Sequence, residues 1–371
     1  MKVKFTLVLT ILFFGMAFGQ SNIEQKFNML HQVKTTPVKH QGKTGTCWSF
    51  ATSSFLENEL IRLGKDELDI SEMFTVRHKL VPMAEKYIRY HGTSNFGSGG
   101  QAHDVFDVIN KYGLVPEEVY SGKNIGLDYH NQAEMSSVLQ GLLDGVLNSK
   151  EKITTSWKKS LEAVLNVYLG TPPQNFEYKG KNYTPKSFAK ELGIDSDNYI
   201  ELTSYTHQPF YEKFNLQLPD NWTNSEYYNI PVNELISIMD NSIKKGYSIA
   251  WDGDTGKDNF YKKEGIALIP ESDEIKEINE LIKEKQITQE DRQKAFENFD
   301  VTDDHLMNIV GIAVNQEGTK FYYTKNSWGT KNKIYDGYWY MSKQYVRLKT
   351  IAILVHKDVI PKEIKDKLKI K

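Results

Sequence analysis

The feature that most constrains this chain is its single cysteine, Cys47, in a sequence of 371 residues. A glycine-bearing turn precedes Cys47, and apolar side chains at helical spacing follow it, so we expect a buried helix that ends before Gly64. The unpaired N–H groups at a helix N-terminus favour a thiolate over a thiol. The sequence therefore predicts a nucleophilic cysteine, and a lone cysteine excludes an intrachain disulfide.

A cysteine nucleophile needs a base and hydrogen-bond donors for the oxyanion that its attack creates. The side-chain amide of Gln41 and the N–H of Cys47 are the expected donors, because Gln41 shortly precedes the cysteine. The base is expected to be a histidine that is near in space and distant in sequence. Of the nine histidines, His305 is the best candidate, because a buried strand pattern follows it.

A predicted β-hairpin adds a partner for His305. Two strand patterns flank a turn at residues 315–318, and a turn centred there makes paired residue numbers sum to about 633. His305 then faces Trp328 and lies at the same open end of the hairpin as Asn326. The amide oxygen of Asn326 can accept a hydrogen bond from the imidazole and fix its tautomer.

These residues resemble the papain superfamily of cysteine peptidases, most closely its bleomycin hydrolase and aminopeptidase C branch. The motifs occur in the family's order: Gln41, Cys47-Trp48-Ser49-Phe50-Ala51, His305 and Asn326-Ser327-Trp328-Gly329, with flanking similarity at 69–72, 99–101, 111–116 and 251–254. The likeness covers roughly residues 31–125 and 235–357. The spacing from Cys47 to His305 is 305 − 47 = 258 positions, against about 130–150 in papain itself, which indicates a long insertion as in that branch.

The resemblance implies a papain-like α+β fold of two lobes, a helical lobe and a β-barrel-like lobe, with the site between them. It implies that Cys47 is the nucleophile, His305 the base and Asn326 the residue that orients the base. It also implies that Gln41 holds the oxyanion and that Trp328 shields the histidine–asparagine pair.

A glycine-rich stretch, Asn95 to Gly100, is expected to form one wall of the cleft. Glycines let a backbone approach closely, so Gly99 and Gly100 can pair with an extended peptide. A plain surface turn is the alternative. Gly99, Gly100 and Trp328 are thus the predicted substrate-binding residues.

Residues 1–19 have the pattern of a secretory signal, with two lysines before an apolar run from Phe5 to Phe18. Ala17-Phe18-Gly19 predicts cleavage before Gln20, and hence a secreted or periplasmic enzyme. The alternative is an uncleaved anchor helix, but the apolar run is short for a membrane span. We therefore expect no stable membrane anchor.

Residues 20–371 are predicted to form one papain-like peptidase domain with an insertion at about 121–234. Residues 135–147 and 156–169 have helical periodicity, and aromatic residues cluster after them. The insertion is expected either to roof the cleft or make subunit contacts, or to be a cap with its own small core. Residues 273–299 are expected to form charged, solvated helices.

Composition excludes several classes of function. Lys and Arg number 46 against 48 Asp and Glu, for a net charge of −2, so no basic surface calls for nucleic acid.

The turn after Asp252 has Lys257 where a calcium loop needs glycine. No histidine or cysteine pair has metal-ligand spacing, so we expect no metal and no cofactor.

The prediction is therefore a cysteine peptidase that hydrolyses peptides through a thioester, most consistent with an aminopeptidase of the bleomycin hydrolase type. A papain-like endopeptidase, a catalytically silent peptide-binding module and a thiol acyltransferase or amidase are the alternatives. The resemblance implies a hexameric homo-oligomer. The segment 357–371 is expected to pack on the β lobe as a short helix, and it lacks the family's further arm that runs into the cleft.

Overall fold

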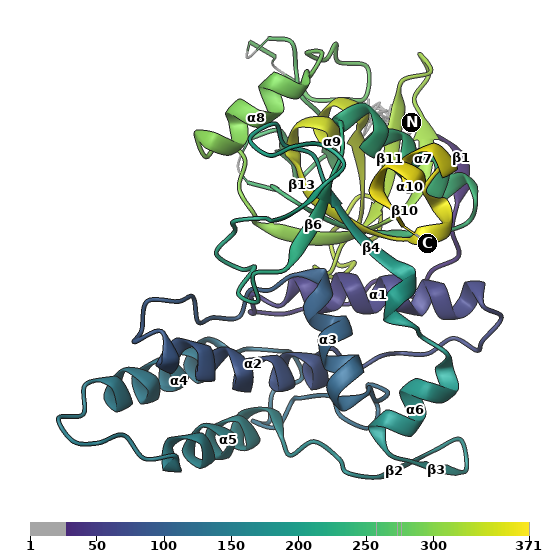
Figure 1. Ribbon diagram of the computed structural model, residues 1–371. Helices are drawn as coiled ribbons and strands as arrows, with labels where there is room; N and C mark the ends of the chain where they lie inside the picture. Colours follow the sequence, from purple (N-terminus) through teal and green to yellow (C-terminus); the bar gives the residue numbers. More distant parts are fainter. Residues whose placement is uncertain (1–26, 257, 273, 276, 371) are drawn as a thin grey trace, which may run out of the picture.

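The computed structural model describes residues 27–256, 258–272, 274–275 and 277–370. The chain forms a helical lobe and a lobe built around one large sheet, with helix α1 lying between them (Figure 1). The predicted two-lobed α+β architecture is confirmed. The predicted signal segment 1–19 and the cleavage before Gln20 lie outside the described residues.

Helix α1 is the wall between the two lobes. Every residue from Cys47 to Leu60 is buried, because other helices cover one side of α1 and the sheet covers the other. The elements of the helical lobe are α1 (Cys47–Arg62), α2 (Glu72–Arg89), α3 (Ala102–Tyr112), α4 (Ala133–Leu147), α5 (Ser156–Leu169), the hairpin β2 (Phe176–Tyr178) and β3 (Lys181–Tyr183), and α6 (Pro185–Leu192). As predicted, Gly64 follows the end of α1 with a positive φ of 74°, a backbone conformation that glycine adopts readily.

The second lobe is organised around a mixed sheet in the order β5-β6-β4-β13-β7-β10-β11-β12-β9-β8, with β1 pairing with β10. Its strands are β1 (Asn28–Gln32), β4 (Tyr199–Thr203), β5 (Lys213–Asn215), β6 (Glu226–Asn229), β7 (Ile249–Gly253), β8 (Phe260–Tyr261), β9 (Ile266–Ala267), β10 (His305–Val314), β11 (Lys320–Lys325), β12 (Tyr338–Ser342) and β13 (Thr350–His356). The remaining elements are α7 (Val232–Lys244), α8 (Gln289–Glu297), α9 (Lys343–Lys349), α10 (Lys362–Leu368) and the 3₁₀ turns η1 (Ser196–Asn198) and η2 (Lys357–Val359).

Successive side chains along the central strands point to opposite faces of the sheet. Ala250, Leu306 and Leu354 belong to the same apolar cluster as α1 and the helical lobe. Their neighbours Trp251 and Met307 point the other way, into the core beneath α7. Side chains on the first face of β7 and β10 therefore lie toward Cys47.

The segment 121–234 belongs to both lobes. Its first part contains α4 and α5 at the predicted positions, and their buried leucines join the core of the helical lobe. Its second part contributes β4, which pairs with β13 of the large sheet. The insertion therefore has no separate core, because both halves extend cores that the rest of the chain also builds.

The prediction of charged helices at 273–299 is wrong for its first part. Of the described residues in that range, only Gln289–Glu297 is helical, and Thr288 and Asp291 form a capping box at its start. The backbone before α8 instead runs beside residues 269–271, where Lys285 N donates to Ile269 O. Tertiary pairing has overridden local helix propensity there.

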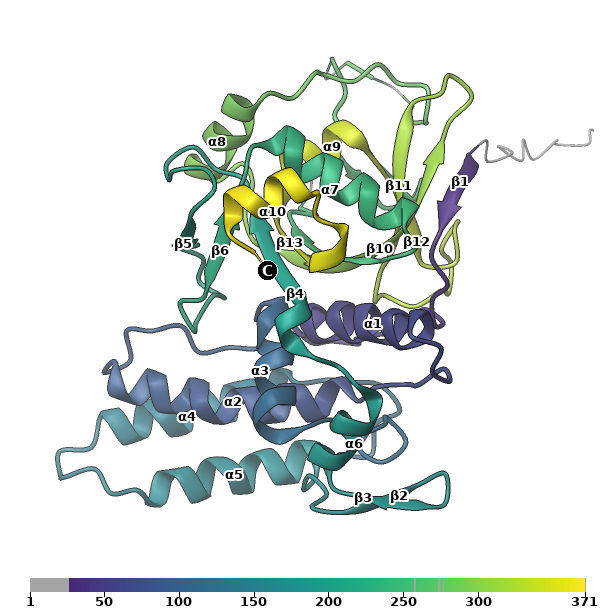
Figure 2. The same ribbon diagram turned by 45° about the vertical axis from the view of Figure 1, so that its right-hand side comes forward.

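The C-terminal segment packs as predicted on the sheet-bearing lobe. Helix α10 lies against that lobe near α7 (Figure 2), and Ile364 and Leu368 are buried in its core. Lys369 and Ile370, the last described residues, line a cavity beside β4 that does not include Cys47.

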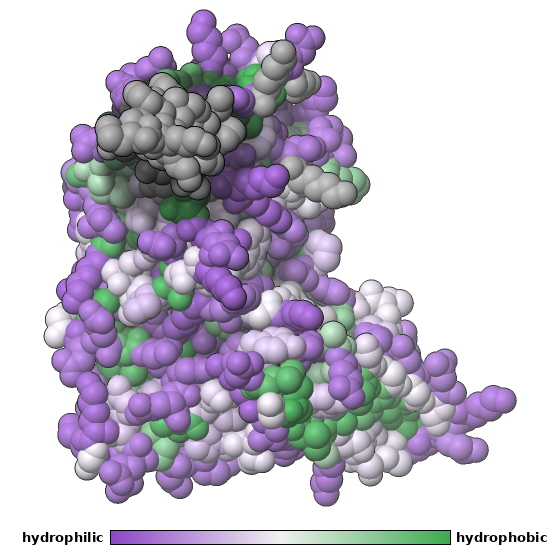
Figure 3. Space-filling view, turned by 180° about the vertical axis from the view of Figure 1, so that it is seen from behind, coloured by the Kyte–Doolittle hydropathy of each residue, from purple (hydrophilic) through white to green (hydrophobic). Residues whose placement is uncertain are grey.

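The surface is mostly polar, with some hydrophobic side chains gathered on the helical lobe when it is viewed from behind (Figure 3). Val138 on α4 and Val167 on α5 are among the exposed large hydrophobic residues. Within the described part of the chain, no helix combines the length and apolarity that a membrane crossing requires.

Candidate active site

Cys47 is the first residue of α1, as predicted. The N–H groups of Ser49 and Phe50 both donate to Thr46 O, so the first turn closes directly after the N-cap, Thr46. The thiol lines a cavity of about 510 Å³ whose walls come from both lobes. The same cavity contains the predicted site residues Gln41, Gly99, Gly100, His305 and Trp328.

The hairpin of β10 and β11 has the predicted register at its open end. Asn308 pairs with Lys325 and Ile309 with Thr324, so the numbers sum to 633, and a bulge after Ile309 shifts the rest by one. This register places His305 at the start of β10 beside the segment that follows β11.

His305 is held from two sides. Its Nε2 lies 2.8 Å from Asn326 Oδ1, and its ring centre lies 4.7 Å from the Trp328 ring. Because Asn326 Oδ1 also accepts the N–H of Ser327, that atom is fixed as the acceptor, and Nε2 of His305 must donate. In the neutral tautomer Nδ1 is then free of a proton and able to accept one.

Gln41 is anchored beside the segment that follows β11. Its Nε2 donates to Thr44 O at 2.8 Å, and its Oε1 accepts from Ser327 Oγ at 2.6 Å. These bonds leave the second amide hydrogen of Gln41 available. The preceding turn is tight: a Cβ on Gly42 would lie 2.1 Å from His130 O, so only glycine fits there.

The thiol of Cys47 is a weaker acid than its position at a helix N-terminus alone would suggest. Burial raises the pKa of Cys47 to about 12, and the charges of Asp303 and Asp252 act in the same direction. Burial also lowers the pKa of His305. The expected preference for a thiolate is therefore outweighed by desolvation, and both groups favour their neutral forms near pH 7.

The glycine loop is a wall of the cavity, as predicted, and its glycines are sterically required. A Cβ on Gly99 would meet the carboxylate of Asp220 at 1.9 Å, and one on Gly100 would lie 2.9 Å from Lys79 Nζ. The ammonium group of Lys79 contacts Gly99 O and lies 4.9 Å from the Trp48 ring centre. Lys79 therefore supports this loop from beneath.

The cavity also contains acidic residues that the sequence analysis did not assign to it, Asp220 and Asp303. Asp220 comes from the insertion, where no motif marked it. Asp303 comes two residues before His305, and that position could have indicated a place in the cleft. Lys262 also lines the cavity, and its ammonium group lies 5.0 Å from the Trp328 ring centre.

Among the described residues, one group of acidic side chains has the spacing of a metal site: Glu57, Asp69 and Glu72. The ammonium group of Lys39 contacts all three, at 2.8 Å from Glu57 and 2.7 Å from Glu72. A fixed cation from the protein thus already compensates these carboxylates. The cluster ties the segment before Gln41 to α1 and α2.

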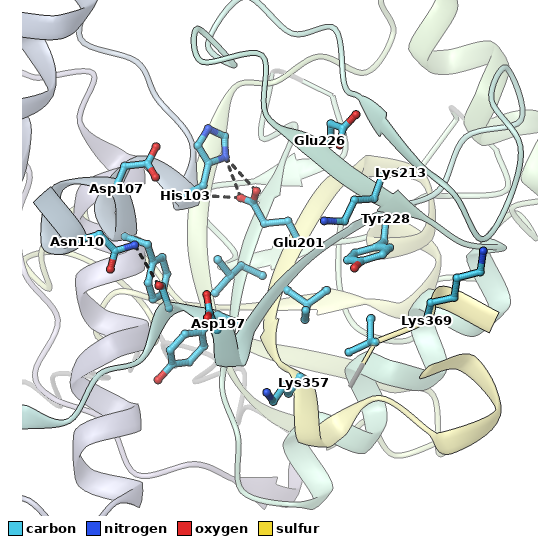
Figure 4. A pocket seen from close by; sticks show the side chains of 16 residues that line it. His103, Asp107, Asn110, Asp197, Glu201, Lys213, Glu226, Tyr228, Lys357 and Lys369 are labelled. Carbon is cyan, nitrogen blue, oxygen red and sulfur yellow. Dashed lines mark hydrogen bonds and ion pairs between the residues drawn. The ribbon is translucent and has the colours of Figure 1, made fainter. Parts of the chain in front are cut away.

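A second cavity of similar size lies beside β4 (Figure 4). It measures about 530 Å³ and contains an ion pair between His103 and Glu201, with 3.0 Å from Nδ1 to Oε2. None of the predicted catalytic residues lines it. Size alone therefore does not distinguish this cavity from the cavity that contains Cys47.

Comparisons with known proteins relate the whole chain to bacterial aminopeptidases. The chain is 22% identical over 368 residues to aminopeptidase C of Lactococcus lactis subsp. cremoris, covering 88% of this chain and 82% of the relative. It is 23% identical to aminopeptidase W of Lactobacillus delbrueckii subsp. lactis, covering 94% and 87%. The crystal structure of PepW from Lactobacillus rhamnosis superposes with a TM-score of 0.73 at 18% identity, covering 92% of this chain and 84% of that chain. The last match supports the fold.

The prediction of a secreted or periplasmic enzyme is contradicted by this comparison, because the aminopeptidase C relatives of lactic acid bacteria are cytoplasmic enzymes. The prediction rested on the composition of residues 1–19 alone. An apolar run after two lysines satisfies the pattern of a signal without demonstrating cleavage.

One family model covers most of the chain. It matches residues 16–371, which include the cysteine, the histidine, the asparagine and the glutamine described above, and it begins inside the segment that was predicted to be removed. The chain belongs to the Peptidase C1-like family.

Proposed function

We propose that this protein is a cysteine aminopeptidase. The observation that carries the proposal is the convergence of Cys47, His305 and Gln41 on one cavity, with His305 fixed by Asn326 at 2.8 Å. The relatives are named aminopeptidases C, G and W. The cavity brings together side chains from distant segments in an arrangement that suits peptide hydrolysis, which supports the reaction class that these names give.

The mechanism follows from the hydrogen bonds. Nδ1 of His305 takes the thiol proton of Cys47 as the sulfur attacks the peptide carbonyl. The second amide hydrogen of Gln41 and the N–H of Cys47 then donate to the oxyanion. The imidazolium returns its proton to the leaving amine, which breaks the peptide bond and leaves a thioester on Cys47.

Water completes the cycle. His305 takes a proton from the water molecule that attacks the thioester, and the released sulfur regains a proton as the free N-terminal amino acid departs. Asn326 keeps the imidazole in the required tautomer throughout, and the ring of Trp328 covers this hydrogen bond. Every step uses side chains of this chain and water.

The test replaces the two groups that make and break bonds. Cys47→Ser and His305→Ala are expected to abolish hydrolysis of an aminoacyl-coumarin, while circular dichroism and the melting temperature stay near those of the unchanged protein. Asn298→Ala, at an exposed position after α8, is a matched control for expression and handling. Wild-type activity in Cys47→Ser would refute the thiol mechanism.

Endopeptidase activity is the second candidate, because one observation favours it. The described end of the chain packs on the β lobe, so it does not close the cleft of Cys47. The discriminating assay compares a free-amine aminoacyl-coumarin with an N-acetylated counterpart. Equal hydrolysis of both would favour an endopeptidase over an aminopeptidase.

The expected hexamer stays a prediction. Light scattering of the purified protein measures it directly: a mass of one subunit would refute it.

A further inference from the structure

We propose that Asp303 binds the α-ammonium group of the first residue of the peptide substrate. This inference rests on the proposed aminopeptidase function and names the group that would enforce it. An aminopeptidase must recognise a free amine close to the scissile bond. Lys369 and Ile370 line a different cavity, so the described tail supplies no carboxylate at Cys47.

Asp303 lies in the right place to receive such a group. It lines the cavity that contains Cys47 and His305, and it is only half-buried, so part of its carboxylate faces the cavity. Gln101 Nε2 donates to Asp303 Oδ2 at 2.6 Å, and Tyr227 donates to the other end of the Gln101 amide at 3.3 Å. These bonds fix one oxygen of Asp303 and leave acceptor capacity on the carboxylate.

Asp303 also lacks a cationic partner. Among the residues that the structure describes, it forms no ion pair within 4.0 Å, and the nearby cation Lys79 interacts more strongly with Asp104 and Asp220 than with Asp303. Burial raises the pKa of Asp303 to about 7, and the charges of Asp220 and Asp304 act in the same direction. A bound ammonium would supply the missing compensation.

A second acid behind Asp303 strengthens the argument. Asp252 on β7 pairs with Leu306 in register, on the face of the sheet that looks toward the helical lobe. It is only 3% exposed and lies within hydrogen-bonding reach of the Asp303 carboxyl group. Burial and the neighbouring Asp303 raise its pKa well above the usual range. The neutral form of Asp252 can donate its proton in a hydrogen bond to Asp303, which favours the charged form of Asp303.

The other carboxylates near the cleft are less suitable, because each already has partners. Asp304 Oδ2 accepts from the Thr255 hydroxyl at 2.7 Å and from the Thr255 N–H at 3.2 Å. Asp220 accepts from Asn95 Nδ2 at 2.8 Å and lies beside Lys79. Asp303 therefore differs from Asp304, which accepts from a backbone N–H, and from Asp220, which has the stronger interaction with Lys79.

Binding of an ammonium at Asp303 also affects the nucleophile. The negative charge of Asp303 is one of the causes that raise the pKa of Cys47. A substrate ammonium offsets that charge and so makes proton transfer from Cys47 to His305 easier. Free-amine substrates would then be favoured in the chemical step as well as in binding.

The experiment measures kcat and KM for a free-amine aminoacyl-coumarin and for its N-acetylated counterpart, with the full-length protein. Asp303→Asn keeps the size of the side chain and removes its charge. We expect kcat/KM for the free-amine substrate to fall roughly tenfold or more, with the value for the acetylated substrate unchanged or higher. Asp303→Glu, which keeps the charge, is expected to retain part of the preference.

Two further variants complete the design. Asp107→Asn removes an exposed carboxylate of the other large cavity, so it should leave both values unchanged. Asp220→Asn removes the competing carboxylate of the cleft and should leave the preference for a free amine in place.

The outcomes separate this inference from the proposed function. A wild-type protein that hydrolyses both substrates equally would overturn both. A wild-type protein that requires a free amine, together with an Asp303→Asn variant that keeps the same requirement, would overturn the role of Asp303 alone. An equal loss of kcat/KM on both substrates in Asp303→Asn would show that Asp303 has a structural role. Loss of the preference for a free amine in Asp220→Asn alone would assign the role to Asp220.

Discussion

The hydrogen bond between His305 and Asn326 allows the most direct quantitative prediction. Both side chains are nearly inaccessible, at 4% and 3% exposure, and the bond is 2.8 Å long. Replacing Asn326 by alanine leaves the Nε2–H of His305 without its acceptor, which costs about 1–3 kcal/mol at a buried site. Because about 1.4 kcal/mol corresponds to a factor of ten in rate, kcat/KM should fall by roughly 5- to 150-fold.

The reduction should stay partial for a structural reason. The Trp328 ring still packs against the imidazole, and Asn326 takes part in no bond that forms or breaks. Steady-state kinetics on an aminoacyl-coumarin would compare Asn326→Ala with Cys47→Ser and with the surface control Asn298→Ala. A rate within twofold of the unchanged protein, or a loss as complete as in Cys47→Ser, would refute the assigned orienting role.

Three other changes test separate parts of the structure. Deleting residues 362–371 removes two buried aliphatic side chains, so the free energy of unfolding in urea should drop by about 3–6 kcal/mol. Any requirement for a free amine should persist in this variant. Loss of that requirement would show that the tail blocks the cleft. Gly99→Ala forces the carboxylate of Asp220 away from a Cβ placed at 1.9 Å, so kcat/KM should fall with little change in melting temperature, and unchanged kinetics would contradict the close approach. Asp303→Asn removes a charge that raises the pKa of Cys47, so iodoacetamide should alkylate Cys47 faster at pH 7; a slower reaction would contradict this electrostatic account.

The parts of the site that could be predicted from the sequence are those that local chemistry determines. A glycine-bearing turn before an apolar helical pattern places Cys47 at the start of α1, since caps and periodicity act over a few residues. The hairpin register depends on one turn, so the residue numbers that sum to 633 bring His305 and Asn326 together. The resemblance to the papain superfamily uses these same local motifs.

Electrostatics and the contribution of the insertion could not be predicted in this way. Burial by both lobes determines the pKa of Cys47, and it outweighs the helix N-terminus that the sequence displays. Asp220 reaches the cavity from a segment without any recognisable motif, because β4 and β6 carry that segment back to the large sheet. The same limit explains the missing helix before α8, where pairing with residues 269–271 overrides a helical composition.

By itself, the amino-acid sequence determined the two-lobed α+β class and which cysteine, histidine and asparagine are the candidates for catalysis, because each depends on short-range pattern or on recognisable motifs. Only the tertiary structure decided which carboxylates face the cleft. The pairing of β7 with β10 places Asp252 next to Asp303, two acids 51 positions apart in sequence (303 − 252). Their charges act on Cys47 through space, and distances through space depend on how the whole chain packs.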